Sequence, residues 1–392
     1  MKHLYIILLV LPLIGFGQGW EQTFSGSVLS DCEGNSVQQT SDGGYIVCGG
    51  ISNFEGFGNQ VYLIKVDELG EEEWSQTFGG TDSDWGDSVQ QTTDGGYIIT
   101  GHTTSFGNGD QDVYLIKTDE NGDEEWFQTY GGIYDDWSRS VQQTSDGGYV
   151  ITGSTSSFEN GSGSRDVYLI KTDGNGDEEW FQTYGDTEKD DWSRSVQQTS
   201  DGGYVITGHT TSFEGGEPLG EFDVYLIKTD NNGNEEWFQT FGENGQDAGY
   251  SVQQTTDEGY VITGYTYLSG GGGQDVYLIK TDGNGNEEWF QTFGVIDSSD
   301  SGHSVQQTSD GGYIIAGYTV SWFEGDYKIY LIKTDSAGNV ETTSTIELPK
   351  PTSKRELIKT TNILGQENTT IKNQPMIEIY DDGSVEKKYI IE

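Results

Sequence analysis

Short apolar segments separated by polar turns recur along the chain with a period of about 54 residues. In the second copy the pattern predicts four strands, at residues 88–92, 97–101, 113–118 and 124–130. Thr93-Asp94-Gly95-Gly96 separates the first two strands and Asp119-Glu120-Asn121-Gly122 the last two. In both turns Asp or Asn starts the turn and Gly accepts a positive φ. Each copy therefore predicts two antiparallel hairpins.

The polarity of the strands predicts their order within a sheet. Tyr-Ile-Ile-Thr and Val-Tyr-Leu-Ile-Lys are apolar on both faces, which requires that both sides of the sheet be covered. Ser-Val-Gln-Gln-Thr is polar and suits an inner strand beside a wet channel, whereas the Trp strand begins with Glu-Glu and suits an outer edge. We therefore expect sheets stacked face to face around a channel, with the strands ordered along the chain from inside to outside.

The repeat is counted by its tryptophans, which are separated by 54, 52, 54, 57 and 52 residues: Trp20, Trp74, Trp126, Trp180, Trp237 and Trp289. This spacing suits a propeller blade and is longer than the coils of most solenoids. The chain starts with a lone Trp strand at 20–24 and ends its repeats with three strands at 304–308, 313–317 and 329–334. The prediction is an all-β, six-bladed β-propeller of four-stranded antiparallel blades over residues 19–345, closed by the N-terminal strand. Residues 340–344 are an alternative for the closing edge.

One segment of each unit, Val-Tyr-Leu-Ile-Lys-Thr-Asp-x-x-Gly-x-x-x-Trp, resembles the quinoprotein-like propeller repeats. The resemblance covers about 15 residues of each unit, and it implies that the six tryptophans have a structural role in locking adjacent blades together. Nothing in the chain matches the cofactor-binding residues of those enzymes. We therefore expect no quinone and no other organic cofactor.

The two ends of the chain carry transport signals. Residues 1–18 have a basic start, an apolar core at 4–16 and small residues before Gln18, which is typical of a cleaved signal peptide. This apolar core is too short to span a membrane, and no longer apolar run follows. The protein is therefore expected to be secreted or held at the outer cell surface, with no membrane span.

Residues 346–392 differ in composition from the rest, and their alternating pattern predicts a small C-terminal β module. Leu364-Gly365 and Lys387-Lys388, followed by the apolar residues 389–391, resemble the C-terminal sorting domain of cargo for the type IX secretion system of Bacteroidota. The resemblance covers about 40 residues and implies the secretion machinery as a partner. The alternative is a small β module without a sorting role.

The net charge of −46 lies almost entirely in the propeller. So acidic a surface excludes nucleic acid as a partner, because phosphate would be repelled. The acidity could attract Ca²⁺ or cationic polymers, or it could serve only solubility in salty water. The chain is expected to be a monomer.

Calcium is a candidate ligand at the turn between the third and fourth strands. Two copies present oxygen ligands at alternate positions, the pattern that a hard cation prefers: Asp119, Asn121 and Asp123, and Asp173, Asn175 and Asp177. An ordinary hairpin turn explains the same residues without a metal, because the Gly does not fall where an EF-type loop needs it.

A second set of acids lies four residues before the Ser of Ser-Val-Gln-Gln-Thr, where we expect loops that ring one mouth of the channel: Asp84, Asp136, Asp191, Asp247 and Asp300. Aromatic and basic residues fall in the same segments: Trp85, Trp137, Trp192, Arg139, Arg194, Tyr250 and His303. Exposed Trp beside Asp is typical of carbohydrate sites. The alternative is that the acids accept turn N–H groups and the rings fill blade interfaces.

Evidence for catalysis is weak, since no Ser/His/Asp set, HExxH motif or zinc spacing appears. Cys32 and Cys48 are the only cysteines, and export makes a disulfide between them possible. Two functions are considered. The first is a non-enzymatic module that binds a glycan or a protein. The second is a polysaccharide-active glycoside hydrolase with two acidic residues at the channel mouth.

Overall fold

In the computed structural model the chain divides into two units, residues 1–340 and 341–392. The structure describes residues 22–24, 31–52, 58–158, 164–185, 189–211, 222–242, 245–267, 273–294, 297–321 and 325–340, together with three strands of the second unit. The predicted signal peptide at 1–18 lies outside the described residues. The described part of the chain contains no helix, and so none that could cross a membrane.

The first unit consists of six antiparallel sheets. Five of them have four strands each: β1 Cys32–Gln39, β2 Tyr45–Ile51, β3 Gln60–Val66 and β4 Glu72–Phe78; β5 Asp84–Gln91, β6 Tyr97–Thr103, β7 Asp112–Thr118 and β8 Glu124–Tyr130; β9 Asp136–Gln143, β10 Tyr149–Thr155, β11 Asp166–Thr172 and β12 Glu178–Tyr184; β13 Asp191–Gln198, β14 Tyr204–Thr210, β15 Asp223–Thr229 and β16 Glu235–Phe241; β17 Asp247–Gln254, β18 Tyr260–Thr266, β19 Asp275–Thr281 and β20 Glu287–Phe293. The sixth has β21 Ser298–Gln307, β22 Tyr313–Ser321 and β23 Tyr327–Thr334.

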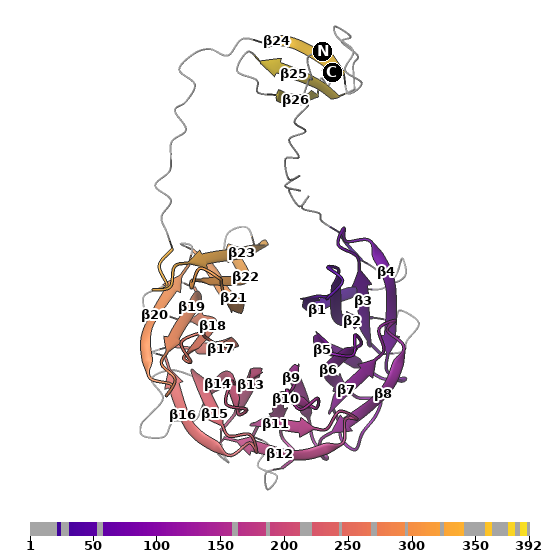
Figure 1. Cartoon of the computed structure of the whole chain (residues 1–392), viewed down its shortest axis with the longest axis vertical. Coiled ribbons are helices and arrows are strands. Elements are labelled where there is room, and N and C mark those ends of the chain that lie inside the picture. Colours follow the sequence, from indigo (N-terminus) through magenta and orange to yellow (C-terminus); the bar gives the residue numbers. More distant parts are fainter. Residues whose placement is uncertain are drawn as a thin grey trace, which may run out of the picture. The chain divides into compact units, whose positions relative to one another are not determined.

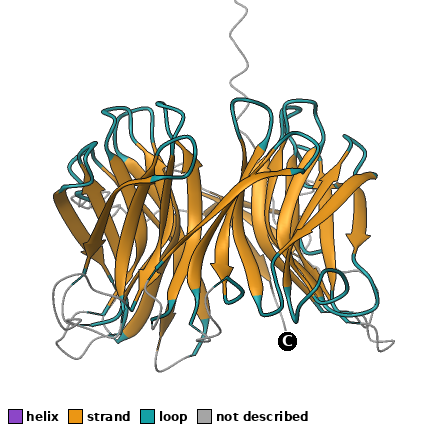
Figure 2. Cartoon of the chain, turned by 90° about the horizontal axis from the view of Figure 1, so that it is seen from below, coloured by secondary structure: helices purple, strands orange, loops and turns teal. Residues whose placement is uncertain are grey.

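The six sheets form a β-propeller, as the repeat predicts (Figure 1). The first strand of every sheet lies nearest the centre of the ring, and the Trp strands β4, β8, β12, β16 and β20 lie on the outside. Loops occupy both ends of the strands (Figure 2). The strand order within each blade, from inside to outside along the chain, is therefore confirmed.

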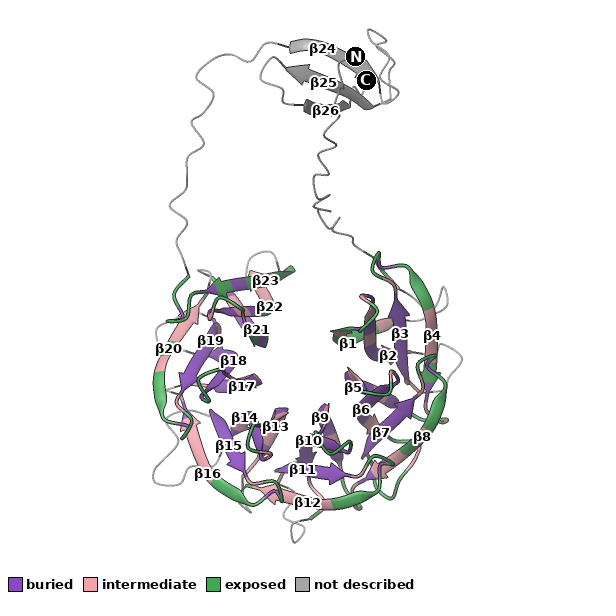
Figure 3. Cartoon of the chain, in the orientation of Figure 1, coloured by how far each residue is buried: buried purple, intermediate pink, exposed green. Residues whose placement is uncertain are grey.

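Apolar side chains from facing blades form the core. Between the first two blades, Val61 and Leu63 of β3 pack with Val89 of β5 and Tyr97 and Ile99 of β6. Equivalent clusters recur at the next four interfaces, so the middle strands of the second to fifth blades are buried along almost their whole length (Figure 3). Each fully buried aliphatic side chain contributes about 1.5–3 kcal/mol. The apolar character of both faces in these strands follows directly from this stacking.

The repeated indoles bridge neighbouring blades. Five of them meet a tyrosine of the next blade at ring-centre distances of 5.7–6.0 Å: Trp74, Trp126, Trp180, Trp237 and Trp289. Trp74 also covers Gly122, which has φ +80°, and a Cβ on that glycine would lie 2.5 Å from the ring. The turn therefore needs glycine both for its backbone and for the indole. Trp20 lies outside the described residues.

The sixth blade has three strands among the described residues, so the predicted pairing of the N-terminal strand with this blade is not seen. Gln22–Phe24 has no strand structure, and Phe24 packs against Tyr62 and Ile64 of the first blade. Phe78 of β4 packs on the second blade in the same way. The N-terminal segment therefore occupies the place of an outer strand relative to the first blade, without a described hydrogen-bonded partner in β23.

The faces on either side of that position are exposed. Val37 of β1 is 65% exposed, whereas its counterpart Val89 is 5% exposed. On β23, Ile329 is 89% and Leu331 64% exposed. The equivalent residues are buried at every other blade interface. The exposed faces of β1 and β23 therefore carry the apolar residues that form a contact between blades elsewhere in the propeller.

The second unit contains a three-stranded antiparallel sheet, β24 Leu357–Asn362, β25 Pro375–Tyr380 and β26 Val385–Tyr389. This sheet lies within residues 346–392, where the alternating pattern predicted a small β module. Residues 363–374, 381–384 and 390–392 lie outside the described residues, and with them Leu364-Gly365 and the end of the apolar run.

Candidate binding site on the inner strands

Every inner strand contains a β-bulge at the same point of the repeat. The pairing register with the second strand skips one residue immediately before Ser-Val-Gln-Gln, and the skipped residues are Asn35, Asp87, Arg139, Arg194, Tyr250 and His303. A bulge leaves one residue outside the ladder and redirects its side chain. The flanking sequence is nearly constant, but the bulged residue differs between most blades. This position therefore varies without any change in the fold around it.

The bulged side chains contact one another from blade to blade. Arg139 Nη1 lies 2.6 Å from Asp87 Oδ1, and His102 Nδ1 lies 3.3 Å from Asp87 Oδ2. The Arg194 guanidinium carbon lies 5.2 Å from the centre of the Tyr250 ring. Tyr250 in turn contacts His303 at a ring-centre distance of 4.8 Å. Because these residues belong to successive inner strands, their contacts follow the central channel.

Two of the predicted tryptophans are stacked beside this row. The rings of Trp137 and Trp192 are 5.5 Å apart and tilted by 14°, and Trp192 also stacks on His209. The guanidinium carbon of Arg165 lies 4.4 Å from the Trp137 ring and 4.3 Å from the Trp192 ring. The structure therefore brings the predicted Trp137, Arg139, Trp192 and Arg194 into one region of the third and fourth blades.

Trp85 has a different role from the other two predicted tryptophans. A Cβ on Gly50 of the preceding blade would lie 2.3 Å from the Trp85 ring, so the indole fills the space above this glycine. This contact agrees with the alternative interpretation of the ring as part of a blade interface.

The predicted mouth carboxylates are not exposed. All five lie at the first positions of the inner strands or within them and are 0–3% exposed: Asp84, Asp136, Asp191, Asp247 and Asp300. Asp84 accepts hydrogen bonds from the hydroxyl groups of Thr103 and Ser105 and from the amide of Gly80. Their burial corrects the expectation that they line an open mouth. The inner strand begins four residues earlier than predicted, which draws each Asp into the blade interface.

Each of these buried Asp residues is faced across the blade interface by a residue at the start of a third strand. Between the fourth and fifth blades this residue is also an acid, and the pair is Asp223 and Asp247. The Cβ position of Gly242 lies 2.2 Å from Asp223 Oδ1 and 2.5 Å from Asp247 Oδ2, so glycine is required where the two carboxylates approach. Burial, and then the neighbouring Asp247, raise the pKa of Asp223 to about 7. Neither oxygen of Asp223 has a hydrogen-bond partner among the described residues.

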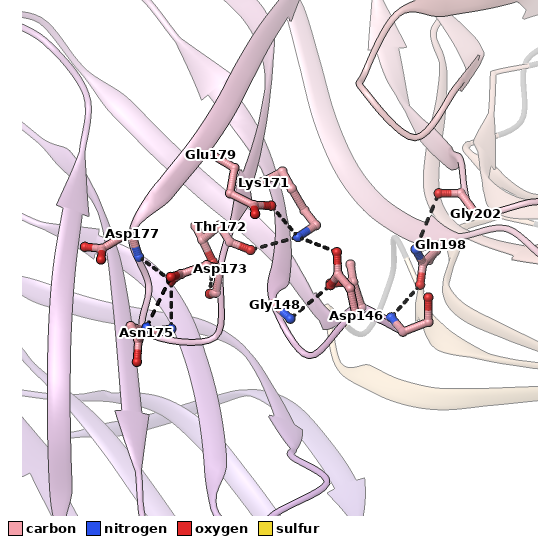
Figure 4. A network of polar contacts seen from close by, with 12 residues as sticks. Asp146, Gly148, Lys171, Thr172, Asp173, Asn175, Asp177, Glu179, Gln198 and Gly202 are labelled. Carbon is pink, nitrogen blue, oxygen red and sulfur yellow. Dashed lines mark hydrogen bonds and ion pairs between the residues drawn. The ribbon is translucent and has the colours of Figure 1, made fainter.

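Other acids hold the buried lysine of the third strand (Figure 4). Lys171 Nζ is 3.0 Å from Asp146 Oδ2 and 2.9 Å from Glu179 Oε2, and it donates to the Thr172 carbonyl at 2.8 Å. Burial alone would raise the pKa of Asp146, but hydrogen bonds from Thr144, Gly148 and Lys171 outweigh it and hold the pKa at about 2. The same arrangement recurs in the other four complete blades.

The calcium candidates at the outer hairpin make local turn contacts. Asp173 Oδ1 accepts the amide N–H of Asn175 at 2.8 Å and that of Asp177 at 3.0 Å, and Asp119 does the same for Asn121 and Asp123. The described residues contain no cluster of three or more metal-ligating side chains. A hairpin turn accounts for these contacts, and binding of Ca²⁺ stays a prediction.

Cys32 and Cys48 are both free thiols in the structure. Cys32 pairs with Ile51 across the hairpin, whereas Cys48 pairs with Ser36. The two cysteines are thus separated by three residues of ladder, about 10 Å, which is beyond the Cα distance that a disulfide spans. The possible disulfide is therefore not formed in this structure.

Asp87, Arg165 and His209 also belong to this region and were not predicted. The sequence signal for Asp87 is the alignment of repeats, where it occupies the variable position before Ser-Val-Gln-Gln. Arg165 lies in the loop just before β11, far along the chain from the rings that it touches, so no local pattern marks it. Burial, and then the charge of Arg194, lower the pKa of His209 to about 3, so its imidazole is neutral at physiological pH.

No protein-family profile matches the chain. A 173-residue segment is 28% identical to the regulatory protein FlaEY of Caulobacter vibrioides, and the match covers 38% of this chain and 18% of that protein. The chain thus spans about a fifth of its curated relative. Similar solved structures include the Pan2 WD40 domain of Neurospora crassa (10% identity, 78% and 80% of the two chains, TM-score 0.46). PorZ of Porphyromonas gingivalis, a surface component of the type IX secretion system, has 9% identity, coverage of 90% and 58%, and a TM-score of 0.41. An endo-1,5-α-L-arabinanase of Thermotoga petrophila has 13% identity, coverage of 90% and 84%, and a TM-score of 0.38.

Proposed function

We propose that the propeller is a non-enzymatic binding module for a glycan or a protein, displayed outside the cell. The observation that carries this proposal is the set of bulged residues on the inner strands. A structural role would be met by the same residue in every blade, as it is at the buried lysine and at the outer tryptophan. Chemically different side chains on identical scaffolds are instead what recognition of an asymmetric ligand requires.

The neighbouring side chains favour a sugar-containing ligand. Trp137 and Trp192 are half-buried, stacked indoles, and Arg139, Arg194, Tyr250 and His303 are polar residues on the same or neighbouring inner strands. Aromatic faces with a few hydrogen-bonding groups are typical of small-ligand sites. None of these residues is among the invariant positions that build the blade core.

Export by a type IX secretion system is the second part of the proposal, and it rests on the resemblance of residues 346–392 to a sorting domain. The three-stranded sheet formed by β24–β26 is compatible with such a module. In a bacterium that has this system, deletion of 346–392 should leave the propeller in the periplasm. Release of the truncated chain at the normal level would refute this part.

Binding is tested by screening the mature chain, starting at residue 19, on a glycan array and measuring reducing-sugar release on every glycan that binds. We expect binding without turnover. Loss of binding on substitution of Trp192 by Ala would assign the ligand to this region. Turnover of a bound glycan would instead favour the glycoside hydrolase.

The hydrolase alternative has one observation in its favour. Asp223, with its pKa raised to about 7, has the protonation expected of a general acid, and Asp247 is its paired carboxylate. Both side chains are only 1% exposed, however, which prevents contact with a polymer. A cavity of about 770 Å³ lies elsewhere, where Asp201 and Glu236 already pair with Lys228.

A further inference from the structure

Arginine is rare in this chain and is concentrated in one place. The sequence contains four arginines, and three of them, Arg139, Arg165 and Arg194, lie in the third and fourth blades of a protein with net charge −46. Arg139 and Arg194 are the bulged residues of adjacent inner strands, β9 and β13. Arg165 precedes β11 and contacts the indoles of Trp137 and Trp192, each of which lies two residues before one of these arginines.

The described residues supply few acceptors for these guanidinium groups. Asp87 pairs with Arg139 and also contacts His102, so this carboxylate already serves two partners. No carboxylate within the described part of the chain forms an ion pair with Arg194, whose Nε is buried and has no hydrogen-bond partner. The Nε of Arg165 is in the same condition. Among the described residues, Arg139 is therefore the one of the three arginines that has a carboxylate ion pair.

Desolvation of an unpaired guanidinium is unfavourable. Burial, and then repulsion by Arg139, lower the pKa of Arg194 from its usual value. An anionic oxygen placed between Arg139 and Arg194 would relieve both effects, because arginine donates paired hydrogen bonds to carboxylate and sulfate in a fixed geometry.

The fold itself does not require arginine at this point. Blades five and six form the same bulge with Tyr250 and His303, and blade one forms it with Asn35. The strands on either side keep the same register in all six blades. A purely structural account explains Arg165, which packs against two indoles. It does not explain arginine in two adjacent blades at a position where the other blades have Asn, Asp, Tyr or His.

We propose that the Arg139–Arg194 side of the inner-strand ring binds an anionic sugar, with the carboxylate or sulfate group between the two guanidinium groups and the sugar ring near Trp137, Trp192 or Tyr250. The proposal rests on the binding function proposed above and names the class of ligand. The excess of negative charge elsewhere on the propeller makes such a site selective, because an anion is repelled from the rest of the surface.

The test is calorimetric titration of the full mature chain with a galacturonate tetramer, with its methyl ester as the matched neutral ligand and a sulfated galactose tetramer as the second anionic source. We expect at least one of the two anionic tetramers to bind at least about tenfold more tightly than the ester. Arg194→Gln should weaken binding of that anionic ligand by about tenfold or more, and Arg194→Lys by less, because lysine keeps the charge but not the paired donors.

Two further variants separate this site from a general charge effect. Lys189→Gln removes one positive charge from the loop before β13, where Lys189 contacts only the Thr211 carbonyl among the described partners, and it should leave the affinity within twofold. Asp87→Asn removes the acid that competes for Arg139 and should strengthen binding. Far-UV circular dichroism and the thermal midpoint check that each variant is folded.

The outcomes distinguish the two proposals. If the galacturonate ester binds as well as both anionic tetramers, or if neutral glycans bind and Arg194→Gln changes nothing, the anionic-ligand inference is wrong while the binding function stands. If no glycan or protein partner binds the wild-type chain at all, both are wrong. Equal losses in Arg194→Gln and Lys189→Gln would also overturn the inference, because they would indicate unspecific attraction.

Discussion

Substitution of Asp223 by Asn should stabilise the propeller at alkaline pH, although it removes a charged residue from a protein rich in ion pairs. Asp223 and Asp247 meet across a blade interface and are each 1% exposed. An amide in place of one carboxylate removes the repulsion between them and supplies a donor. The first interface already has this arrangement, because Gln60 occupies the equivalent position and donates to Asp84 at 3.4 Å.

The magnitude follows from the pKa. A folded-state pKa of about 7 against about 3.9 in the unfolded chain means that the native state binds the proton more tightly. The contribution of Asp223 to stability is therefore most favourable below about pH 4, falls as the pH rises from there through about 7, and is constant above. Three pH units correspond to an upper bound of about 4 kcal/mol, and we expect on the order of 2 kcal/mol after relaxation of the interface.

The assay is urea unfolding followed by tryptophan fluorescence at pH 4.5 and pH 8. Asp223→Asn should raise the midpoint at pH 8 and change it little at pH 4.5. The matched control is Asp201→Asn, which removes the same charge from the partner of Lys228, where burial is outweighed by Thr199, Lys228 and Gly203 and the pKa is held at about 2. Because this pKa is depressed, Asp201 stabilises the fold above about pH 4, and its loss should lower the midpoint at pH 8.

A lower midpoint for Asp223→Asn at pH 8, or an equal rise at both pH values, would show that the acid pair is not destabilising in its charged form. If both variants raised the midpoint at pH 8 by the same amount, relief of the overall net charge would explain the result and the local argument would fail.

Three further outcomes are expected. Lys171→Met should lower the free energy of unfolding in urea by about 2 kcal/mol, because three charge-assisted contacts to a 3% exposed ammonium are lost. Lys333→Met in the sixth blade, where the side chain is 43% exposed, should lower it by less than about 1 kcal/mol. Equal losses would mean that Lys333 is buried in solution. Glu258→Gly should stabilise the fold by about 1 kcal/mol and so raise the thermal midpoint, since Glu258 has φ +67° where the other five blades have glycine, and no change would show that the turn is unstrained. The double variant Gln22→Cys with Leu331→Cys tests whether the N-terminal strand closes the ring. The two residues are the repeat counterparts of Gln291 and Leu278, which pair in the fifth blade, so closure should allow a cross-link under oxidation, and a chain that stays uncross-linked would exclude it.

The fold was predictable because the repeat encodes it several times over. Glycine in the hairpin turns, two-faced apolar strands and a spaced tryptophan each point to stacked blades, and the strand predicted at 124–130 coincides with β8. The inner strand was placed four residues too late. Asp84-Trp85-Gly86-Asp87 is polar and interrupted by a bulge at Asp87, so it lacks the alternation that marks a strand.

The candidate site was only partly predictable, for a physical reason. Trp137, Arg139, Trp192 and Arg194 stand out in the sequence, because they depart from the other copies of the repeat. The contacts of Arg165 with both indoles join residues that are far apart in sequence, one in its own blade and one in the next. Period and local pattern cannot reveal such contacts, because only the stacking of the blades creates them.

The acidic composition directed attention to the carboxylates as binding groups, whereas the structure directs it to the few arginines. Acids are abundant, and many of them make contacts that stabilise the fold. Asp84 is buried and accepts a hydroxyl hydrogen bond, Asp146 and Glu179 form ion pairs with Lys171, and Asp173 accepts the backbone N–H groups of a turn. Arginine is scarce, and the fold forms the same bulge without it. In a repeat protein the common residues are therefore explained by packing that recurs in each blade, whereas the rare residues at a tolerant position have no such explanation. This contrast makes Arg194, rather than any of the acids, the residue whose substitution best separates ligand recognition from folding.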